Sequence, residues 1–166
     1  MAPRFEELIE RHHDEIFRYV WRLLGSDHQA DGAMDAEDLV QDVFLRAYEN
    51  FATLRVASNY RAWLYKIATN RTLTILSRSK QRREKSLVLQ HESESAAAPT
   101  QDCKDNRVTG FIEALPAKQN AAVTLRYLQD LDYAEIAAIM DCSEETARAN
   151  VSQAIRRLRL LLQEGR

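Results

Sequence analysis

The chain has 166 residues, of which 45% are hydrophobic, and a formal net charge of −2. This length suits one ordinary domain or two small ones, and the apolar content is enough for packed cores, which excludes a globally disordered chain. No apolar run approaches the ~20 residues that cross a bilayer, and the N-terminus lacks the apolar segment of a signal peptide. We therefore expect a cytoplasmic protein that does not insert into membranes.

The two cysteines, Cys103 and Cys142, lie far apart and fit no zinc-binding spacing with the four histidines. Two free thiols in a reducing compartment are the expected state. We expect no bound metal and no cofactor, and a redox role for either thiol stays open.

The first elements in chain order have the 3.6-residue apolar period of amphipathic helices. A helix is expected over 4–24, and Gly25 should end it before a polar loop over 26–34. The second helix is expected to run from Asp35 to about Asn50, because the Asp35 side chain can cap the free amides of the first turn. Strand-like alternation of β-branched residues is absent from the sequence.

A third helix should follow a break at 51–57, capped by Ser58 or Asn59 and ending at about Arg78. Three helices with these apolar stripes can share one core, which predicts an N-terminal domain over 1–80. The periodicity is then lost over 81–105, where small and polar residues predict a flexible linker.

The remaining segment, 106–166, is expected to form a second domain. A short helix over 108–114 precedes one that Pro116 opens and that runs to about 128. The sequence then reads YAEIAAIM, a three-residue break DCS, and an Arg-bearing helix from Glu144, which is the pattern of a helix-turn-helix. The predicted fold is therefore all-α, with two small helical domains joined by a flexible linker, the C-terminal one a helix-turn-helix.

Charge is strongly segregated along the chain, with a net charge of −7 over 1–50, +8 over 51–88, −7 over 89–147 and +4 over 148–166. Binding to nucleic acid needs local rather than total positive charge, so the two basic blocks predict two nucleic-acid surfaces. The second block lies on the second helix of the helix-turn-helix, the element that such units place in the major groove. Arg side chains suit guanine or phosphate there, and Asn and Gln suit adenine.

The motifs in both domains resemble the extracytoplasmic-function (ECF) sigma factors of the sigma-70 family. The segments DAEDLVQDVFLRAYENF (35–51) and NYRAWLYKIATNRTLTIL (59–76) resemble region 2, and residues 114–162 resemble region 4. The resemblance implies an alternative sigma factor that directs core RNA polymerase to specific promoters and assists their melting, with no catalytic activity. The implied partners are the β′ clamp and β flap of polymerase, promoter DNA and an anti-sigma factor, and the free protein is expected to be a monomer.

The resemblance also implies roles for individual residues. The core-polymerase set comprises Asp38, Leu39, Gln41, Asp42, Phe44 and Leu45. The −10 set, expected to bind the melted promoter strand, comprises Arg55, Ser58, Asn59, Tyr60, Arg61, Lys66, Asn70 and Arg71. The −35 set, expected to read duplex DNA, comprises Thr146, Arg148, Asn150, Ser152, Gln153, Arg156 and Arg157. The chain departs from relatives at Asn150 and Gln153, where Arg is frequent, and at Asp141, where Gly is frequent.

Two other functions remain as alternatives. A stand-alone helix-turn-helix regulator usually dimerises to read paired half-sites, and this sequence has no obvious dimer segment. A helical nuclease would use Asp35, Glu37, Asp38 and Asp42 to hold Mg²⁺, but no base, nucleophile or phosphate loop accompanies these carboxylates.

Overall fold

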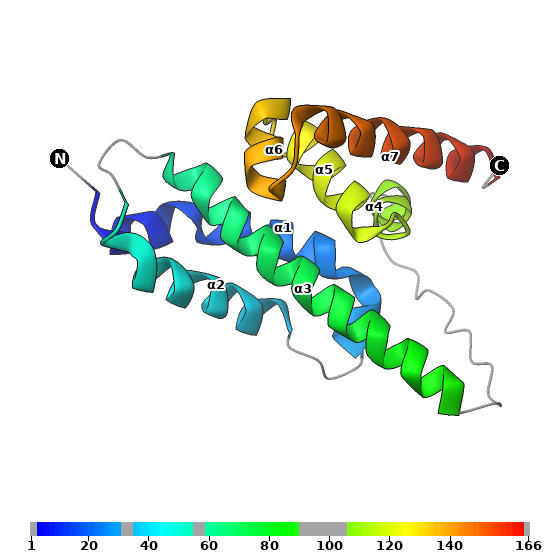
Figure 1. The fold of residues 1–166 in the computed structure, drawn as a ribbon, viewed down its shortest axis with the longest axis horizontal. Coiled ribbons are helices and arrows are strands. Elements are labelled where there is room, and N and C mark those ends of the chain that lie inside the picture. The colour runs from blue at the N-terminus through cyan, green and yellow to red at the C-terminus, as the bar shows by residue number, and fades with distance from the viewer. Residues whose placement is uncertain (1–2, 31–34, 55–58, 90–105, 165–166) are drawn as a thin grey trace.

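A computed structural model describes residues 3–30, 35–54, 59–89 and 106–164. These residues form seven α-helices and no strand, which confirms the all-α prediction (Figure 1). The helices are α1 (Phe5–Ala30), α2 (Ala36–Phe51), α3 (Tyr60–Leu89), α4 (Asn106–Glu113), α5 (Ala117–Tyr127), α6 (Tyr133–Met140) and α7 (Glu144–Glu164).

The N-terminal unit is a bundle in which α1, α2 and α3 each pack against the other two. The Asp35 side chain caps α2, as the sequence predicts, by accepting a hydrogen bond of 2.8 Å from the amide of Asp38. Polar groups are satisfied inside this bundle: the hydroxyls of Tyr19 on α1 and Thr69 on α3, both fully buried, lie 2.7 Å apart. These contacts fix α3, the most basic helix, against α1.

Two predicted helix ends are wrong. Gly25 breaks the helical conformation with a φ of 70°, but helix resumes and α1 reaches Ala30, so residues 26–30 are not loop. The third helix does not end at Arg78, because α3 continues to Leu89. The expected linker therefore begins nine residues later than residue 81, and its remainder, 90–105, lies outside the described residues.

The extension of α3 has a local physical cause. It leaves the bundle, so that Leu87 and Val88 are 71% and 84% exposed, and no apolar stripe marks it as a helix. Its many Arg, Lys, Gln and Leu residues have high helix propensity, and neither Gly nor Pro interrupts them. Lys80 and Glu84 also form an i,i+4 ion pair of 4.0 Å.

The C-terminal unit comprises α4 to α7, with α6 and α7 as the predicted helix-turn-helix. Helix α7 packs on α5 and α6, while α6 lies against α3 and α5 contacts both α1 and α3 (Figure 1). Buried Leu131 and Ile136 belong to one continuous core with the side chains of the N-terminal bundle. The two units are thus packed together, an arrangement that the sequence did not predict.

Candidate functional site

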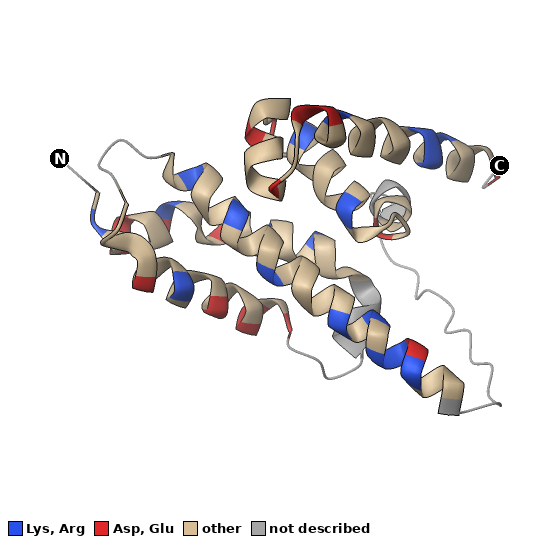
Figure 2. Ribbon diagram, viewed as in Figure 1, with Lys and Arg blue, Asp and Glu red and all other residues tan. Residues whose placement is uncertain are grey.

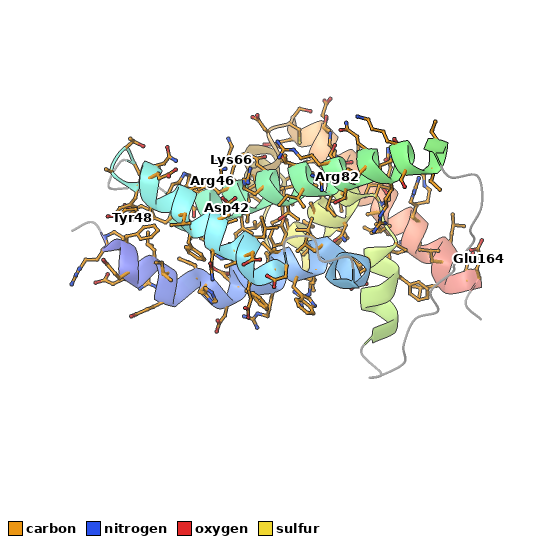
Figure 3. All side chains as sticks on the ribbon, turned by 90° about the horizontal axis from the view of Figure 1, so that it is seen from below. Asp42, Arg46, Tyr48, Lys66, Arg82 and Glu164 are labelled. Carbon is orange, nitrogen blue, oxygen red and sulfur yellow. The ribbon has the colours of Figure 1, made fainter. Side chains whose placement is uncertain are left out.

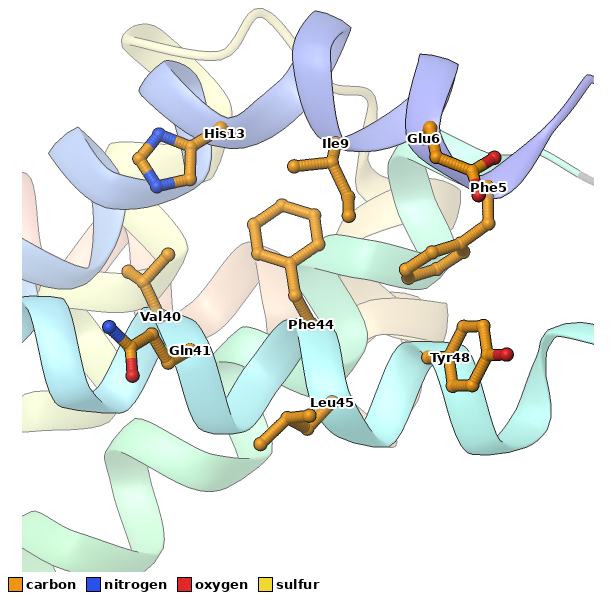
Figure 4. Close-up of a pocket in the computed structure, with 9 residues that line it drawn as sticks. All are labelled: Phe5, Glu6, Ile9, His13, Val40, Gln41, Phe44, Leu45 and Tyr48. Carbon is orange, nitrogen blue, oxygen red and sulfur yellow. The ribbon is translucent and has the colours of Figure 1, made fainter.

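An apolar groove of about 490 Å³ runs between α1 and α2 (Figure 4). Its outer rim carries two strongly exposed apolar side chains of α2, Leu45 at 64% and Tyr48 at 65% exposure. The complete lining is Phe5, Glu6, Ile9, His13, Val40, Gln41, Phe44, Leu45 and Tyr48. The rings of His13 and Phe44 stack in this groove with centroids 5.9 Å apart. Such a groove suits an apolar face of a partner protein.

The core-polymerase set is divided by this geometry. Gln41, Phe44 and Leu45 line the groove, although Phe44 is only 7% exposed and serves mainly as its floor. Leu39 is fully buried, and its side chain is part of the bundle core. The prediction that it lies on a docking face is therefore wrong. Asp38 is exposed in the first turn of α2.

Asp42 faces α3 rather than the groove. Its Oδ2 lies 2.5 Å from Nε of Arg71 and 3.2 Å from Nε of Arg46, so one carboxylate pairs with two guanidinium groups. Figure 3 labels Asp42 and Arg46 on α2 and Lys66 on α3. Arg71 was expected to contact DNA, but here its guanidinium pairs with Asp42 and joins α2 to α3.

The groove also contains residues that the sequence did not predict. Phe5, Ile9 and His13 come from α1, and Phe5 makes an edge contact with Tyr48, with ring centroids 5.3 Å apart. The core-polymerase set expected from the sequence lies wholly on α2, and only the packing of the bundle brings the α1 side chains beside it. The apolar side chains recur on one face of α1, and this pattern predicts that the face is buried. It does not indicate that the face lines a binding groove.

The −10 set occupies the first part of α3, apart from Arg55 and Ser58, which lie outside the described residues. Asn59 is exposed and caps α3, since its Oδ1 accepts a hydrogen bond of 3.1 Å from the amide of Ala62. Tyr60 is half-buried and packs its ring 6.0 Å from that of Phe51. Lys66 is half-buried and Asn70 is exposed.

Arg61 belongs to a polar cluster that joins the two units of the molecule. We name it the Glu15 cluster; it consists of Glu15 on α1, Arg61 and Tyr65 on α3, and Gln129 in the turn between α5 and α6. Arg61 donates from Nε to Glu15 Oε2 at 3.0 Å and from Nη2 to Gln129 Oε1 at 3.2 Å. The Tyr65 hydroxyl lies 2.7 Å from Gln129 Oε1 and 3.2 Å from Glu15 Oε2, and can donate to either.

The Glu15 carboxylate is stabilised in its charged form. Burial by itself would raise its pKa, but hydrogen bonds from His12 and Arg61, with the positive charge of Arg61, outweigh burial and hold the pKa of Glu15 below its usual range. Burial and the neighbouring Glu15 charge raise the pKa of Tyr65, so its hydroxyl stays a proton donor at neutral pH. The cluster is therefore an ion pair between Glu15 and Arg61 with further hydrogen bonds that involve Tyr65 and Gln129.

The ends of both helices of the helix-turn-helix are fixed by local interactions. Asp132 and Glu135 form a capping box at the start of α6, with reciprocal bonds of 2.8 and 3.0 Å. Asp141 ends α6 in the left-handed region with a φ of 55°. Ser143 then accepts a 3.1 Å hydrogen bond from the amide of Thr146 at the start of α7.

The outward face of α7 carries most of the −35 set. Ala147, Val151 and Ala154 are buried against α5 and α6, which turns the polar residues between them to solvent. The exposed members are Thr146, Arg148, Ser152, Gln153, Arg156 and Arg157, whereas Asn150 is half-buried. Figure 2 shows basic residues at intervals along α3 and α7, although the first turn of α7 carries the acidic Glu144 and Glu145.

Two members of the −35 set contact residues of other helices that the sequence did not indicate. The Arg148 guanidinium lies 4.8 Å from the ring centroid of Tyr133, and Arg126 lies 5.2 Å from the same centroid. Gln119, which is 9% exposed, donates a hydrogen bond of 3.0 Å to Gln153. Both supporting residues come from other helices, and no spacing in the sequence marks them.

Two of the four carboxylates considered for a magnesium site, Asp35 and Asp42, serve other purposes in the fold. Asp35 caps α2, and Asp42 pairs with two arginines. No group of three or more His, Cys, Asp or Glu residues with metal-binding geometry occurs in the described part of the chain. Within the same residues, no helix combines the length and the apolar character that crossing a membrane requires.

Comparisons with known proteins identify both units. Residues 8–83 match the family model "Sigma-70 region 2", and residues 106–158 match "Sigma-70, region 4". The match to region 2 disfavours a stand-alone helix-turn-helix regulator, because it adds a second sigma-factor unit to the DNA-reading one.

Similar proteins cover nearly the whole chain. The ECF RNA polymerase sigma-E factor of Escherichia coli K12 is 30% identical, over 90% of this chain and 82% of its own. The ECF sigma factor SigE of Mycolicibacterium smegmatis is 29% identical over 95% of this chain, which spans only 61% of that relative's length. The sigma factor RpoE of Bartonella quintana, solved with the anti-sigma factor NepR, matches with a TM-score of 0.73 and 26% identity over 98% of both chains.

That structural match extends over the helix-turn-helix unit and the bundle together, and the two family models fall on these same two units. Because the chain is 30% identical to a relative and covers 82% of that relative's length, it belongs to the ECF sigma factors of the sigma-70 family.

Proposed function

We propose that the protein is a promoter-specificity subunit that binds core RNA polymerase, reads the −35 element as duplex and captures the −10 element as a single strand. One observation carries this proposal: an apolar groove with exposed Leu45 and Tyr48 on one unit accompanies a recognition helix with a polar and basic outward face on the other. The first feature suits a protein partner, and the second suits DNA.

The groove between α1 and α2 is the proposed polymerase-docking surface. Exposed leucine and tyrosine over an apolar floor gain from burial by a partner helix. In this proposal Asp42 is a structural residue, because its carboxylate holds α2 to α3 through Arg71.

The start of α3 is the proposed −10 surface. Asn59 and Tyr60 offer a hydrogen-bonding group and a stacking ring, and Arg61 and Lys66 offer positive charge for the strand backbone. Captured bases offset the lost duplex stacking, which averages roughly 1.4 kcal/mol for each base-pair step. The chain itself performs no catalysis in this proposal. It acts in the cytoplasm, and an anti-sigma factor regulates it.

Transcription in vitro tests the function. Core RNA polymerase is supplied with this protein on a promoter library, and the start sites are mapped. We expect a defined set of start sites that polymerase alone does not use. Replacing Arg148 with Ala should weaken −35 preference by roughly 1–3 kcal/mol at one position.

Arg159→Ala is the matched control, since Arg159 is an exposed arginine of α7 outside the −35 set. It should retain the wild-type preference. The absence of any new start site with a folded protein contradicts the proposed function, and an unchanged preference in Arg148→Ala contradicts the role of that residue.

A further inference from the structure

A buried amide side chain of α5 contacts the DNA-facing surface of α7. Helix α5 packs along α7 (Figure 1), and Gln119 in the first turn of α5 is only 9% exposed. Its Nε2 donates a hydrogen bond of 3.0 Å to Oε1 of Gln153, an exposed member of the −35 set. Gln153 therefore reaches the surface with one end of its amide already bound to the protein.

Apolar packing fixes the position of the Gln119 side chain. Gln119 and Val123 are four positions apart on α5, so they share the face that packs on α7. Val123 and Leu115 are 5% and 6% exposed and form a cluster with Ala154 of α7, which is fully buried and adjacent in sequence to Gln153. The Gln119 amide is thus held in a packed contact between the two helices.

The other end of the Gln119 amide has no partner among the described residues. Its Oε1 is buried and accepts no hydrogen bond from that part of the chain. A buried acceptor without a partner costs folding free energy, and an apolar side chain of similar size, such as methionine, avoids that cost. Stability alone therefore gives little reason for an amide at this position, whereas the bond to Gln153 gives it a use in binding.

The direction of this hydrogen bond determines which groups Gln153 can offer to a base. Because its Oε1 is turned toward Gln119, its Nε2 is directed away from α5 and can donate to a base. An unconstrained glutamine pairs with adenine through both ends of its amide, since the oxygen accepts from N6 and the nitrogen donates to N7. Guanine instead presents two acceptors, N7 and O6, which suit a group that only donates.

We propose that Gln119 is a positioning residue that makes Gln153 a hydrogen-bond donor, so that Gln153 reads guanine rather than adenine in the −35 element. This inference rests on the proposed function, because it requires α7 to lie in the major groove. It reverses the base that a glutamine by itself would favour. Gln119 acts through Gln153 and is itself buried.

Transcription in vitro with core polymerase and a promoter library randomised at the −35 positions tests this inference. The position that Gln153 reads is the one whose base preference is lost in Gln153→Ala, and there the wild type should favour guanine over adenine. Gln119→Met removes the amide and allows Gln153 to turn, so the adenine-to-guanine ratio of the transcripts should rise roughly 2- to 10-fold. Gln163→Met, the same change at an exposed position of α7 outside the −35 set, should keep the wild-type ratio.

Gln119→Glu gives an independent test of the bond direction. A carboxylate only accepts hydrogen bonds, so it should bind Nε2 of Gln153 and leave Oε1 to accept from a base. Adenine and cytosine, which present amino donors, should then gain over guanine at the same position. Gln163→Glu is the matched control for the added charge. If circular dichroism shows that Gln119→Met does not fold, Gln119→Glu must show the shift.

A wild-type preference for adenine at this position, or a folded Gln119→Met with an unchanged ratio, overturns the positioning role. Base preferences that all survive in Gln153→Ala overturn it as well. In each of these cases a −35 preference that depends on other residues of α7 leaves the proposed function intact. A wild type without preference at any −35 position contradicts the proposed function itself.

Discussion

At the scale of single residues, the Glu15 carboxylate has three hydrogen-bonding partners. It accepts hydrogen bonds from His12, Arg61 and Tyr65, which come from two helices. In the sequence it is one of many acids of the N-terminal segment, and nothing distinguishes it from Glu10. Its importance arises from the packing of α1 against α3.

The pH dependence of stability should report on Glu15. Its folded-state pKa lies below the ordinary value of 4.5, so its contribution is fully present above that pH and is lost as pH falls through the lower, folded value. Glu15→Gln should unfold at lower urea than the wild type at pH 7, and this difference should shrink by pH 3. Glu10→Gln, an exposed change on the same helix, should follow the wild type at both pH values. A constant difference for Glu15→Gln at both pH values would contradict the assignment.

At the scale of elements, the sequence predicted helix starts better than helix ends. Asp35 and Asn59 cap α2 and α3 as expected, because a cap is a local interaction between a side chain and the next turn. The end of α3 was wrong by about eleven residues, since its final turns have no apolar stripe and depend on propensity alone. Asp141 does adopt the left-handed conformation that its turn position demands.

The end of α6 offers a test of backbone strain. Asp141 has a φ of 55°, which glycine adopts without cost and alanine adopts with a penalty. Asp141→Gly should therefore be more stable than Asp141→Ala by about 1 kcal/mol, as measured by chemical denaturation. Equal stability of the two variants would show that the turn relaxes in solution.

The groove on α1 and α2 predicts a selective effect on polymerase binding. Leu45→Glu places a charge on the exposed rim, so the protein should stay folded while its affinity for core polymerase falls at least tenfold, or about 1.4 kcal/mol. Leu87→Glu makes the same change at a leucine of similar exposure on α3, away from the groove. Binding assays without DNA compare the two variants, and equal losses would argue against the groove.

At the scale of the whole molecule, the main feature is the packing of two units that the sequence predicts as separate domains. The continuous core passes from the three-helix bundle into α6 through Ile136. The two basic surfaces are consequently not independent, because a residue of the first, Arg61, bonds to the second unit.

This shared core predicts cooperative unfolding. Calorimetry of the full chain should give one thermal transition in which the calorimetric and van't Hoff enthalpies agree. Ile136→Ala removes a fully buried side chain. It should lower the midpoint temperature of the single transition of the whole chain, rather than that of a small separate transition. Two resolved transitions in the wild type would show that the units unfold separately.

The sequence by itself determined the helical fold, the helix-turn-helix, the caps and the positions of the basic blocks, because each depends on residues within one or two helical turns. Only the tertiary structure decided that Leu39 is core, that Asp42 and Arg71 pair, that α1 completes the groove, and that Gln129 reaches Arg61. The Arg61–Gln129 bond joins residues 68 positions apart. A long-range contact depends on which amphipathic faces pack against each other. Helical periodicity shows that a face is buried, but it does not show which element covers that face.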